Sequence, residues 1–373
     1  MSDIKSPVVT LTPSPTLDRT YYVHDLIEGG VNRADGVVEE LAGKGINVTK
    51  GLNLIGMAAP GVVPIGNEDP SVLKRTGHTE SLVPLWVDGS LRVSTTMVIK
   101  DGATTKVNEA PRPLTSEDWK AVIELTVETV TKCDAKWLVI AGALPTDLST
   151  GKYVDLQPLF DAMKKLGVRV ALDTSGEALQ YWAKNGAASV MKPNAEELAS
   201  AVGRSLLTNG DVIDAARELC ANGVECVLAS LGADGMIGVT KNHAWAARTP
   251  PIKVINTVGA GDSTLAGFLS AVAATTTAEE DDRFGVGFDV PKQHARGYFD
   301  GRAKPRRAFE RASDHLKNSK KKETQPGLFL FLTLHCRLVA RNANLDGVAN
   351  AQFRIQNKTL NYKIITINAN TIG

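Results

Sequence analysis

The chain has 373 residues, 43% of them hydrophobic, and a formal net charge of +1 at neutral pH. This length and apolar content support one large α/β domain or two ordinary ones, and they argue against global disorder. The near-neutral charge does not favour nucleic acid as a partner. No apolar run approaches the ~20 residues that a membrane helix needs. We therefore expect neither nucleic acid nor membrane as a partner.

The cysteines and the first residues bear on the cellular compartment. The four cysteines form no CxxC pair and have no histidine nearby at metal-ligand spacing. The chain passes from Met1 almost directly into a strand-like segment, which leaves no room for a signal peptide. A protein with no disulfide framework is typical of a reducing compartment, so we expect a cytoplasmic protein.

The first part of the chain predicts short strands separated by turns. Val8–Thr12 is typical of a buried strand, which Pro13 and Pro15 end, and Asp18 is expected to follow in a polar turn. Ligands bind at the carboxyl ends of strands in open α/β sheets, so Asp18 could accept hydrogen bonds from sugar hydroxyls. Stabilisation of the turn explains this aspartate equally well. Further short strands are expected at residues 21–23 and 36–40.

Two later segments carry candidate ligands for an anion. Ala42–Asn47 contains a Gly-Lys-Gly turn before an amphipathic helix, so backbone can approach a ligand there, with Lys44 and Asn47 as donors. Residues 91–108 predict a β-hairpin around Asp101-Gly102, and we assign it to a second, smaller sheet because it interrupts a β/α alternation. Arg92 in this hairpin could reach a substrate phosphate, or it could be a solvated charge on a strand.

Strands and helices alternate through the middle of the chain. This alternation predicts a mostly parallel sheet that is covered on both faces. The expected helices are residues 114–130, 154–166 and 212–222, and the expected strands are 137–141, 168–172, 189–191 and 226–229. A glycine turn follows the last of these strands, at residues 230–235.

Residues 252–273 are where the chemistry is expected. A short apolar strand, the turn Gly259-Ala260-Gly261 and an apolar helix follow one another, with Asp262 and Ser263 at the helix start, where Ser and Asp favour capping. Such a turn directs backbone N–H groups outward, and the helix dipole adds positive potential, so the site suits an anion. A general base beside a transferring phosphoryl group explains the additional acid. A capped helix after a glycine turn is the alternative.

Taken together, these segments resemble the ribokinase-like carbohydrate kinases of the PfkB type, and within them the branch that phosphorylates ketohexose phosphates. The resemblance covers residues of about 8–287 and depends on six motifs in family order. They are Thr-Pro-Ser-Pro-Thr-Leu-Asp (12–18), Gly-Lys-Gly-Ile-Asn (43–47), Lys-Val-Asn-Glu (106–109), Lys-Pro-Asn-x-x-Glu (192–197), Ser-Leu-Gly-x-x-Gly (230–235) and Asn-Thr-Val-Gly-Ala-Gly-Asp-Ser (256–263).

The resemblance implies a fold and a set of roles. The fold would be a three-layer α/β sandwich with a mostly parallel central sheet and a small β-sheet lid, formed by residues of about 19–40 and 90–109 of a kinase domain at 1–287. Asp262 would deprotonate the acceptor hydroxyl, while Gly259, Ala260 and Gly261 form the anion hole. The ATP site would be lined by Lys192, Asn194, Glu197, Ser230, Gly232 and Gly235. Glu197 would organise Mg²⁺ through water. The sugar phosphate would face Asp18, Gly43, Lys44, Asn47 and Arg92.

The resemblance also implies a substrate and an assembly. Fructose 1-phosphate is the expected acceptor, which the enzyme would convert to fructose 1,6-bisphosphate. Fructose 6-phosphate or tagatose 6-phosphate is the alternative acceptor. We expect a homodimer through the lid strands, because an edge hairpin permits pairing. Ala141 and Ala143 stand where the family usually has Ser, which affects the expected contacts of the substrate loop.

The last 86 residues depart from the family pattern. After Gly287 relatives continue with a helix of small residues beside the adenine, whereas this chain has bulky residues, a basic stretch at 296–322 and an Asn-rich end. We favour a frame change in the coding sequence near residue 287. A genuine appended segment and a divergent but fold-completing end are the alternatives. On the first hypothesis, residues 288–373 have no packed core and the chain binds sugar phosphate but holds ATP poorly.

Overall fold

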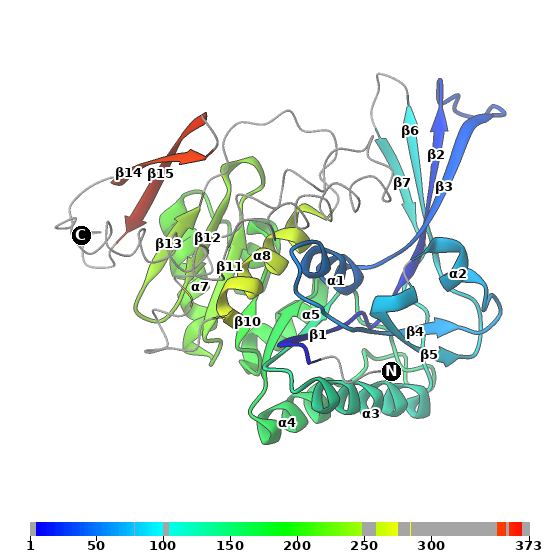
Figure 1. Ribbon diagram of the computed structural model, residues 1–373, viewed down its shortest axis with the longest axis horizontal. Coiled ribbons are helices and arrows are strands. Elements are labelled where there is room, and N and C mark those ends of the chain that lie inside the picture. Colours follow the sequence, from blue (N-terminus) through cyan, green and yellow to red (C-terminus); the bar gives the residue numbers. More distant parts are fainter. Residues whose placement is uncertain are drawn as a thin grey trace, which may run out of the picture. The chain divides into compact units, whose positions relative to one another are not determined.

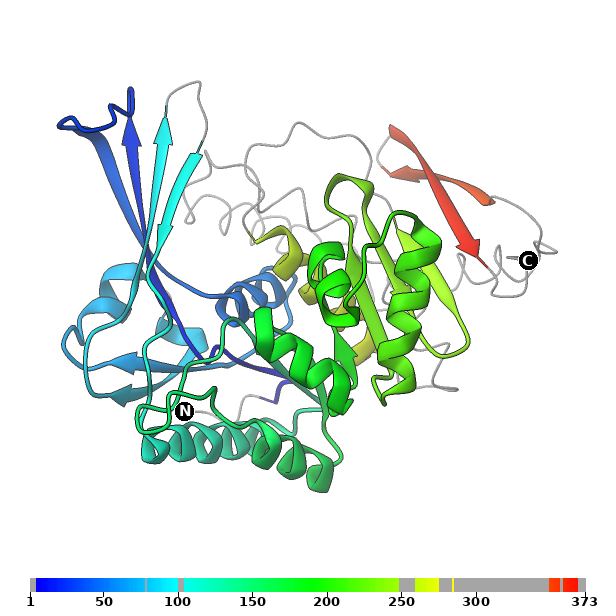
Figure 2. The same ribbon diagram turned by 180° about the vertical axis from the view of Figure 1, so that it is seen from behind.

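The computed structural model describes residues 5–77, 79–99, 104–247, 259–274, 284, 349–355 and 358–367 (Figures 1 and 2). The chain divides into two compact units, Met1–Ser189 and Val190–Gly373. Within the described residues, no helix is long and apolar enough to cross a membrane.

The larger sheet of the first unit is entirely parallel. Its strand order is β5-β4-β1-β8-β9. The strands are β1 (Val8–Leu11), β4 (Gly61–Gly66), β5 (Leu82–Val87), β8 (Trp137–Ala141) and β9 (Arg169–Asp173). Every residue of β1, β4 and β8 is buried, as expected for parallel strands with both faces covered. The expected mostly parallel α/β sheet is confirmed in this unit.

Helices cover both faces of this sheet. Figure 1 shows α1 on one side of it and α3 and α4 on the other. The helices of the unit are α1 (Lys44–Leu54), α2 (Val72–Thr76), α3 (Ser116–Cys133), α4 (Gln157–Leu166) and α5 (Gly176–Asn185), with a 3₁₀ turn at Thr79–Ser81. Helix α4 begins three residues later than the expected residue 154. Pro158 has no N–H group to donate to the Val154 carbonyl, and it lies in the first turn of the helix instead. The Asp155 carboxylate accepts a hydrogen bond from the Gln157 N–H at 2.9 Å.

A second, four-stranded sheet has the order β3-β2-β6-β7, which confirms that the hairpin belongs to a smaller sheet. Its strands are β2 (Thr16–Val23), β3 (Ala34–Ala42), β6 (Val93–Ile99) and β7 (Thr104–Asn108). The turn expected around Asp18 is wrong, since Asp18 lies within β2, opposite Glu40 of β3 and Ser94 of β6. Pairing on both edges of β2 outweighs the local tendency of this segment to turn.

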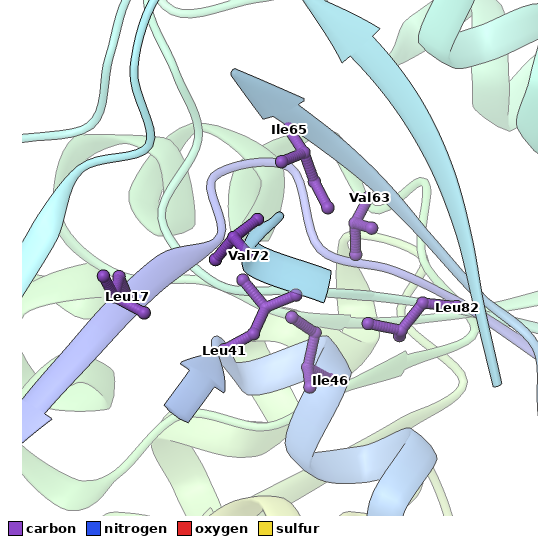
Figure 3. Close-up of a cluster of buried hydrophobic side chains, with 7 residues drawn as sticks. All are labelled: Leu17, Leu41, Ile46, Val63, Ile65, Val72 and Leu82. Carbon is purple, nitrogen blue, oxygen red and sulfur yellow. The ribbon is translucent and has the colours of Figure 1, made fainter. Parts of the chain in front are cut away.

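An apolar cluster joins the base of the small sheet to the larger one (Figure 3). Its seven members come from β2, β3, α1, β4, α2 and β5. They are Leu17, Leu41, Ile46, Val63, Ile65, Val72 and Leu82. Each buried aliphatic side chain contributes about 1.5–3 kcal/mol. The base of the small sheet is therefore firmly held, while Val37, Val38 and Val107 further along it are more than half exposed.

The second unit is a mixed sheet with its own helices. Strands β10 and β11 are parallel, whereas β11-β12-β13-β15-β14 are antiparallel neighbours. The strands are β10 (Val190–Met191), β11 (Cys226–Ser230), β12 (Met236–Val239), β13 (Ala244–Ala247), β14 (Ala349–Ile355) and β15 (Lys358–Ile367). The helices are α6 (Ala195–Val202), α7 (Asn209–Ala221) and α8 (Ala260–Ala274), with a 3₁₀ turn at Gly232–Asp234. Figures 1 and 2 show α7 and α8 on opposite faces of these strands.

Two strands near the C-terminus were not predicted from the sequence. Residues 349–355 and 358–367 form a hairpin, and its strand β15 pairs with β13. Phe284, near the end of the family-like sequence, is 1% exposed and stacks on Phe268 of α8. The expected strand at 252–255 and the basic stretch at 296–322 lie outside the described residues.

Candidate active site

The carboxyl ends of β10 and β11 bring the expected ATP-site residues of the second unit together. The two strands pair in parallel from Val190 and Cys226 onward, so residues just after both strands meet at one edge. The Ser230 N–H donates to the Pro193 carbonyl at 3.0 Å, and Asn194 forms a bridge with Ser230. The predicted ligands Asn194 and Ser230 therefore lie side by side.

Asn194 and Glu197 form a reciprocal cap at the start of α6. The Asn194 side chain accepts from the Glu197 N–H, and the Glu197 carboxylate accepts from the Asn194 N–H, both at 2.8 Å. This capping box satisfies two backbone donors that a helix N-terminus otherwise leaves unpaired. The Lys-Pro-Asn-x-x-Glu motif thus has a structural role that the sequence reasoning did not assign to it. The helix start it stabilises also directs positive potential toward the strand ends.

The glycine turn after β11 forms one wall of a pocket. The Leu231 N–H donates to the Gly235 carbonyl at 2.8 Å, which closes the turn. Residues of this turn, of the start of α6 and of the segment before α7 line the same pocket. The pocket has a volume of about 360 Å³. Its lining includes Asn194, Ser230, Gly232, Leu207 and Thr208. Three of the expected nucleotide ligands therefore share one hollow, whereas Lys192, Glu197 and Gly235 are not among its lining residues.

The start of α8 places a carboxylate and an ammonium group in one buried corner. The helix begins at Ala260, so Asp262 lies in its first turn and not at the N-cap, and Asp262 is 6% exposed. Lys192 is also 6% exposed. A Cβ atom placed on Gly261 would lie 3.1 Å from the Lys192 Nζ atom, so that ammonium rests against the bare backbone of the turn. An anion at this helix start would meet both the lysine and the helix dipole.

The expected acceptor residues of the first unit converge where β1 ends and the small sheet begins. The Arg92 guanidinium donates to the carbonyl oxygens of Ser14 at 2.9 Å, Pro15 at 3.3 Å and Glu109 at 3.0 Å. Gly43 lies against the same segment, since a Cβ there would be 3.6 Å from the Pro15 Cα. Arg92 is thus oriented by backbone oxygens, and burial lowers its pKa although Asp18 and Glu109 oppose the change.

The Gly43-Lys44-Gly45 turn needs its glycines for steric reasons. Gly43 has a φ of 146°, and a Cβ there would lie 2.5 Å from the Thr12 Cγ2 atom. A Cβ on Gly45 would lie 2.4 Å from the Thr12 Oγ1 atom. The turn therefore packs its backbone directly on the end of β1, and the Asn47 N–H donates to the Gly43 carbonyl at 2.9 Å as α1 begins. Lys44 leaves this turn to pair with Asp173 at 2.8 Å.

Asp18 is a buried acid with a raised pKa. Burial and, to a smaller extent, the neighbouring Glu40 raise its pKa to about 6, although Lys50, Lys106 and Arg92 act in the opposite direction. Its buried Oδ1 atom has no hydrogen-bond partner in the part of the chain that the structure describes. A buried carboxylate oxygen without a donor is costly, so this position is suited to a ligand that brings a hydroxyl group.

Two buried hydroxyl groups at the same edge were not among the residues predicted from the sequence. Thr12 follows β1, Thr174 follows β9, and the Oγ1 atom of each has no partner among the described residues. Both side chains are almost fully buried. Their position immediately after a strand was the available signal, but a threonine at a strand end is too common to be selected without the burial.

The fold and these sites define a class of protein. The ends of parallel strands are where α/β folds bind ligands, and a helix start beside a lysine suits a phosphate group. Comparisons with known proteins agree. A sequence model described as pfkB family carbohydrate kinase matches residues 8–288.

Individual relatives extend this match. The 1-phosphofructokinase of Bacillus subtilis is 31% identical over 281 residues, which is 75% of this chain and 90% of that protein. The ATP-dependent 6-phosphofructokinase isozyme 2 of Escherichia coli is 31% identical over 292 residues, with the same two coverages. The crystal structure of Escherichia coli phosphofructokinase-2 in complex with fructose-6-phosphate superimposes with a TM-score of 0.64 at 26% identity, covering 77% of this chain and 93% of that one.

The chain belongs to the pfkB family of carbohydrate kinases. Its fold is the expected ribokinase-like α/β fold with a smaller second sheet, and its activity class is that of a phosphotransferase with an alcohol group as acceptor.

Proposed function

We propose that this chain is an ATP-dependent kinase that converts fructose 1-phosphate to fructose 1,6-bisphosphate. The observation that carries the proposal is the corner at the start of α8, where Lys192 rests against Gly261 and Asp262 is buried one residue further. Phosphoryl transfer depends on positioning and on charge neutralisation more than on covalent chemistry. A buried base beside a backbone anion hole and an ammonium group supplies both.

Each residue has a distinct task in this mechanism. Asp262 accepts the proton of the acceptor hydroxyl as that oxygen attacks the γ-phosphorus. The N–H groups of Gly259, Ala260 and Gly261 and the Lys192 ammonium stabilise the negative charge on the transferring group. The remainder of ATP extends toward Asn194, Ser230, Gly232 and Gly235 at the strand ends. The bond to the β-phosphate oxygen breaks as the new bond forms, and ADP leaves.

The acceptor site is assigned to the corner of the first unit. The carboxylate of Asp18 accepts hydrogen bonds from sugar hydroxyls, which would give its buried Oδ1 atom the donor it lacks among the described residues. Gly43, Lys44, Asn47 and Arg92 hold the phosphate and the sugar through N–H donors and charge. We further propose that the small sheet acts as a lid that excludes water once the sugar is bound.

The nucleotide would be bound with Mg²⁺. Among the described residues no group of three His, Cys, Asp or Glu side chains could hold a metal directly. Glu196 and Asp234 nevertheless line the pocket together with Asn194, and Glu197 lies in the first turn of α6. Magnesium retains several waters and needs few direct protein ligands, so this set of oxygen atoms fits a water-mediated site with Glu197 as its organiser. When bound, the ion neutralises charge on the phosphates.

The identity of the acceptor is tested by a coupled ADP-release assay on the full chain. Fructose 1-phosphate, fructose 6-phosphate and tagatose 6-phosphate are compared at equal concentration. We expect the highest kcat/KM for fructose 1-phosphate. A higher value for either of the other two would transfer the assignment to that sugar, and no ADP release with any of them would overturn the kinase proposal.

A non-catalytic sugar-phosphate-binding protein is the second candidate, and the C-terminal sequence favours it. The family match ends at residue 288, and bulky or charged residues follow it. We infer that the kinase domain ends near residue 287 and that residues 288–373 are an atypical tail. Tight binding of fructose 1-phosphate together with ATP binding too weak for turnover would establish this candidate. Replacing the tail with a family-like segment should then restore turnover.

We also propose a homodimer that forms through the strands of the small sheet. Apolar side chains stay exposed there, with exposed fractions of 45% for Tyr22, 52% for Val37 and Val38, and 59% for Val107. Exposed apolar side chains on a small sheet suit a protein interface. Sedimentation analysis of Val37→Lys should show dissociation to monomers, and an unchanged assembly would overturn the proposal.

A further inference from the structure

Asp173 is a buried charge for which the proposed mechanism has no task. It is the last residue of β9 and is 0% exposed. Burying an ionised carboxylate costs several kcal/mol unless an opposite charge and hydrogen bonds compensate it. A position that only had to fill space at the end of this strand could hold an apolar residue without that cost. The acid therefore needs an explanation beyond packing.

The partner of this acid is a residue of the proposed acceptor site. The Lys44 Nζ atom lies 2.8 Å from the Asp173 Oδ1 atom, although the two residues are 129 positions apart in the sequence. The Lys44 side chain is 36% exposed while that of Asp173 is fully buried. The ammonium group thus sits at a boundary, with the carboxylate below it and solvent on its open side.

The backbone on both sides of this pair is rigid. Lys44 follows Gly43, whose backbone packs directly on Thr12, and the Gly45 backbone is equally close to the same threonine. On the other side, the Gly142 N–H donates to the Asp173 carbonyl at 2.9 Å. Both ends of the ion pair are therefore anchored to strand ends of one parallel sheet, β1 and β9.

We infer that Asp173 is a positioning residue that holds the Lys44 ammonium in place for an anionic group of the acceptor. A lysine side chain loses rotamer entropy when it is fixed. Pairing with a rigid buried carboxylate fixes it before the ligand arrives, so less of this cost falls on binding. The inference rests on the proposed function, because it assumes that Lys44 contacts the sugar phosphate.

A double-mutant cycle tests whether Asp173 acts through Lys44. Asp173→Asn should lower kcat/KM for the sugar phosphate by about 10–100-fold, the usual effect of misplacing a positioning group, with less than about a threefold change in KM for ATP. In a Lys44→Met background the same substitution should cost less than about threefold, because the group it positions is gone. Equal losses in both backgrounds would overturn the inference.

Thermal unfolding distinguishes a positioning role of Asp173 from a role in folding. Lys44→Met removes the ammonium group from the buried carboxylate, so it should lower the midpoint of thermal unfolding, and adding Asp173→Asn should restore that midpoint. The double variant would then be stable yet still impaired for the sugar phosphate. Asp134→Asn removes an exposed ion pair with Lys136 in the same unit and is the matched control, with no expected kinetic effect.

A readout that does not need turnover keeps this inference distinct from the proposed function. Acetylation of Lys44 by acetic anhydride is followed by mass spectrometry, with and without inorganic phosphate. We expect phosphate to protect Lys44 in the wild-type chain and to protect it at least about threefold less in Asp173→Asn. Equal protection in both would overturn the positioning role even in an active kinase. An inactive wild-type chain that shows the expected difference would overturn the proposed function alone.

Discussion

The two candidate sites of this protein are stabilised in opposite ways. In the second unit the motif residues satisfy one another: Asn194 and Glu197 cap a helix, and Leu231 and Gly235 close a turn. In the first unit, buried oxygen atoms of Asp18, Thr12 and Thr174 lack hydrogen-bond partners among the described residues. The nucleotide side is thus built from backbone groups that are complete in the free protein. The acceptor side keeps polar atoms that a ligand would complete.

This difference has a physical consequence. A site made of helix starts and closed turns costs little stability and recognises phosphate by its charge, which many ligands share. A site with buried, unsatisfied oxygen atoms destabilises the free fold, and it binds more tightly a ligand whose hydroxyl groups donate to those atoms. We therefore expect selectivity to arise mainly in the first unit and the general phosphoryl-transfer chemistry in the second.

The largest expected effect concerns the base. Asp262→Asn should lower kcat by about 10²–10⁴-fold, the usual contribution of a positioned general base. Binding of fructose 1-phosphate, measured by calorimetry, should stay within about threefold of wild type, because Asp262 belongs to the second unit and the residues proposed to bind the sugar phosphate belong to the first. Near-normal turnover would mean that Asp262 only supports the helix, and it would contradict the assignment of phosphoryl-transfer chemistry to the second unit.

A substitution in the neighbouring turn tests the corner between Lys192 and α8. Gly261→Ala adds a Cβ 3.1 Å from the Lys192 Nζ atom, so the flexible end of that lysine must move. We expect kcat/KM for ATP to fall by about 10–100-fold with little change in the unfolding midpoint. The matched control is Gly210→Ala in α7, where the added atom meets Thr208 Oγ1 at an ordinary 3.4 Å. That control should be active, and equal losses in both variants would contradict the assignment.

Replacing the buried acid Asp18 of the acceptor site should increase the free energy of unfolding at neutral pH. Burial and Glu40 raise the Asp18 pKa from 3.8 to about 6, so the folded chain binds this proton more tightly than the unfolded chain does. Stability is therefore lost as pH rises from about 4 to about 6. Asp18→Asn should raise the free energy of unfolding by about 1–3 kcal/mol at pH 7, and the gain should vanish near pH 4.

The same acid should make binding dependent on pH. Affinity for the sugar phosphate should fall below about pH 6, because the carboxylate that accepts the sugar hydroxyls becomes protonated there. Denaturant unfolding and calorimetry between pH 4 and 8 check both statements. The exposed Asp35 of β3 provides the control, and Asp35→Asn should change neither quantity. A variant Asp18→Asn that is less stable at pH 7 would show that the acid stabilises the free fold.

The smallest expected effect distinguishes the helix-capping role of Glu197 from its proposed role in organising Mg²⁺. Glu197→Gln keeps an acceptor for the Asn194 N–H, so the unfolding midpoint should hardly change, whereas Glu197→Ala should cost about 0.5–2 kcal/mol. If Glu197 organises Mg²⁺, both variants should need more Mg²⁺ for half-maximal rate. Asp118→Ala in the equivalent capping box of α3 is the control for stability alone. An unchanged Mg²⁺ requirement in Glu197→Gln would leave Glu197 with the structural role only.

The sequence by itself determined the class of fold and most of the candidate residues. Periodic apolar segments separated by glycine turns are local signals, so the parallel strands, the small second sheet and the helix that carries Asp262 in its first turn could be read from spacing alone. The six ordered motifs then led to the family.

Only the tertiary structure decided how those residues are used. The placement of Asp18 within β2, the three backbone acceptors of Arg92 and the pairing of Lys44 with Asp173 all join segments far apart in the chain. Burial, which raises the pKa of Asp18 and leaves Thr12 and Thr174 without partners among the described residues, is likewise a property of the packed fold. Local sequence does not encode these features, because the cost of burying a polar atom depends on the distant groups that surround it.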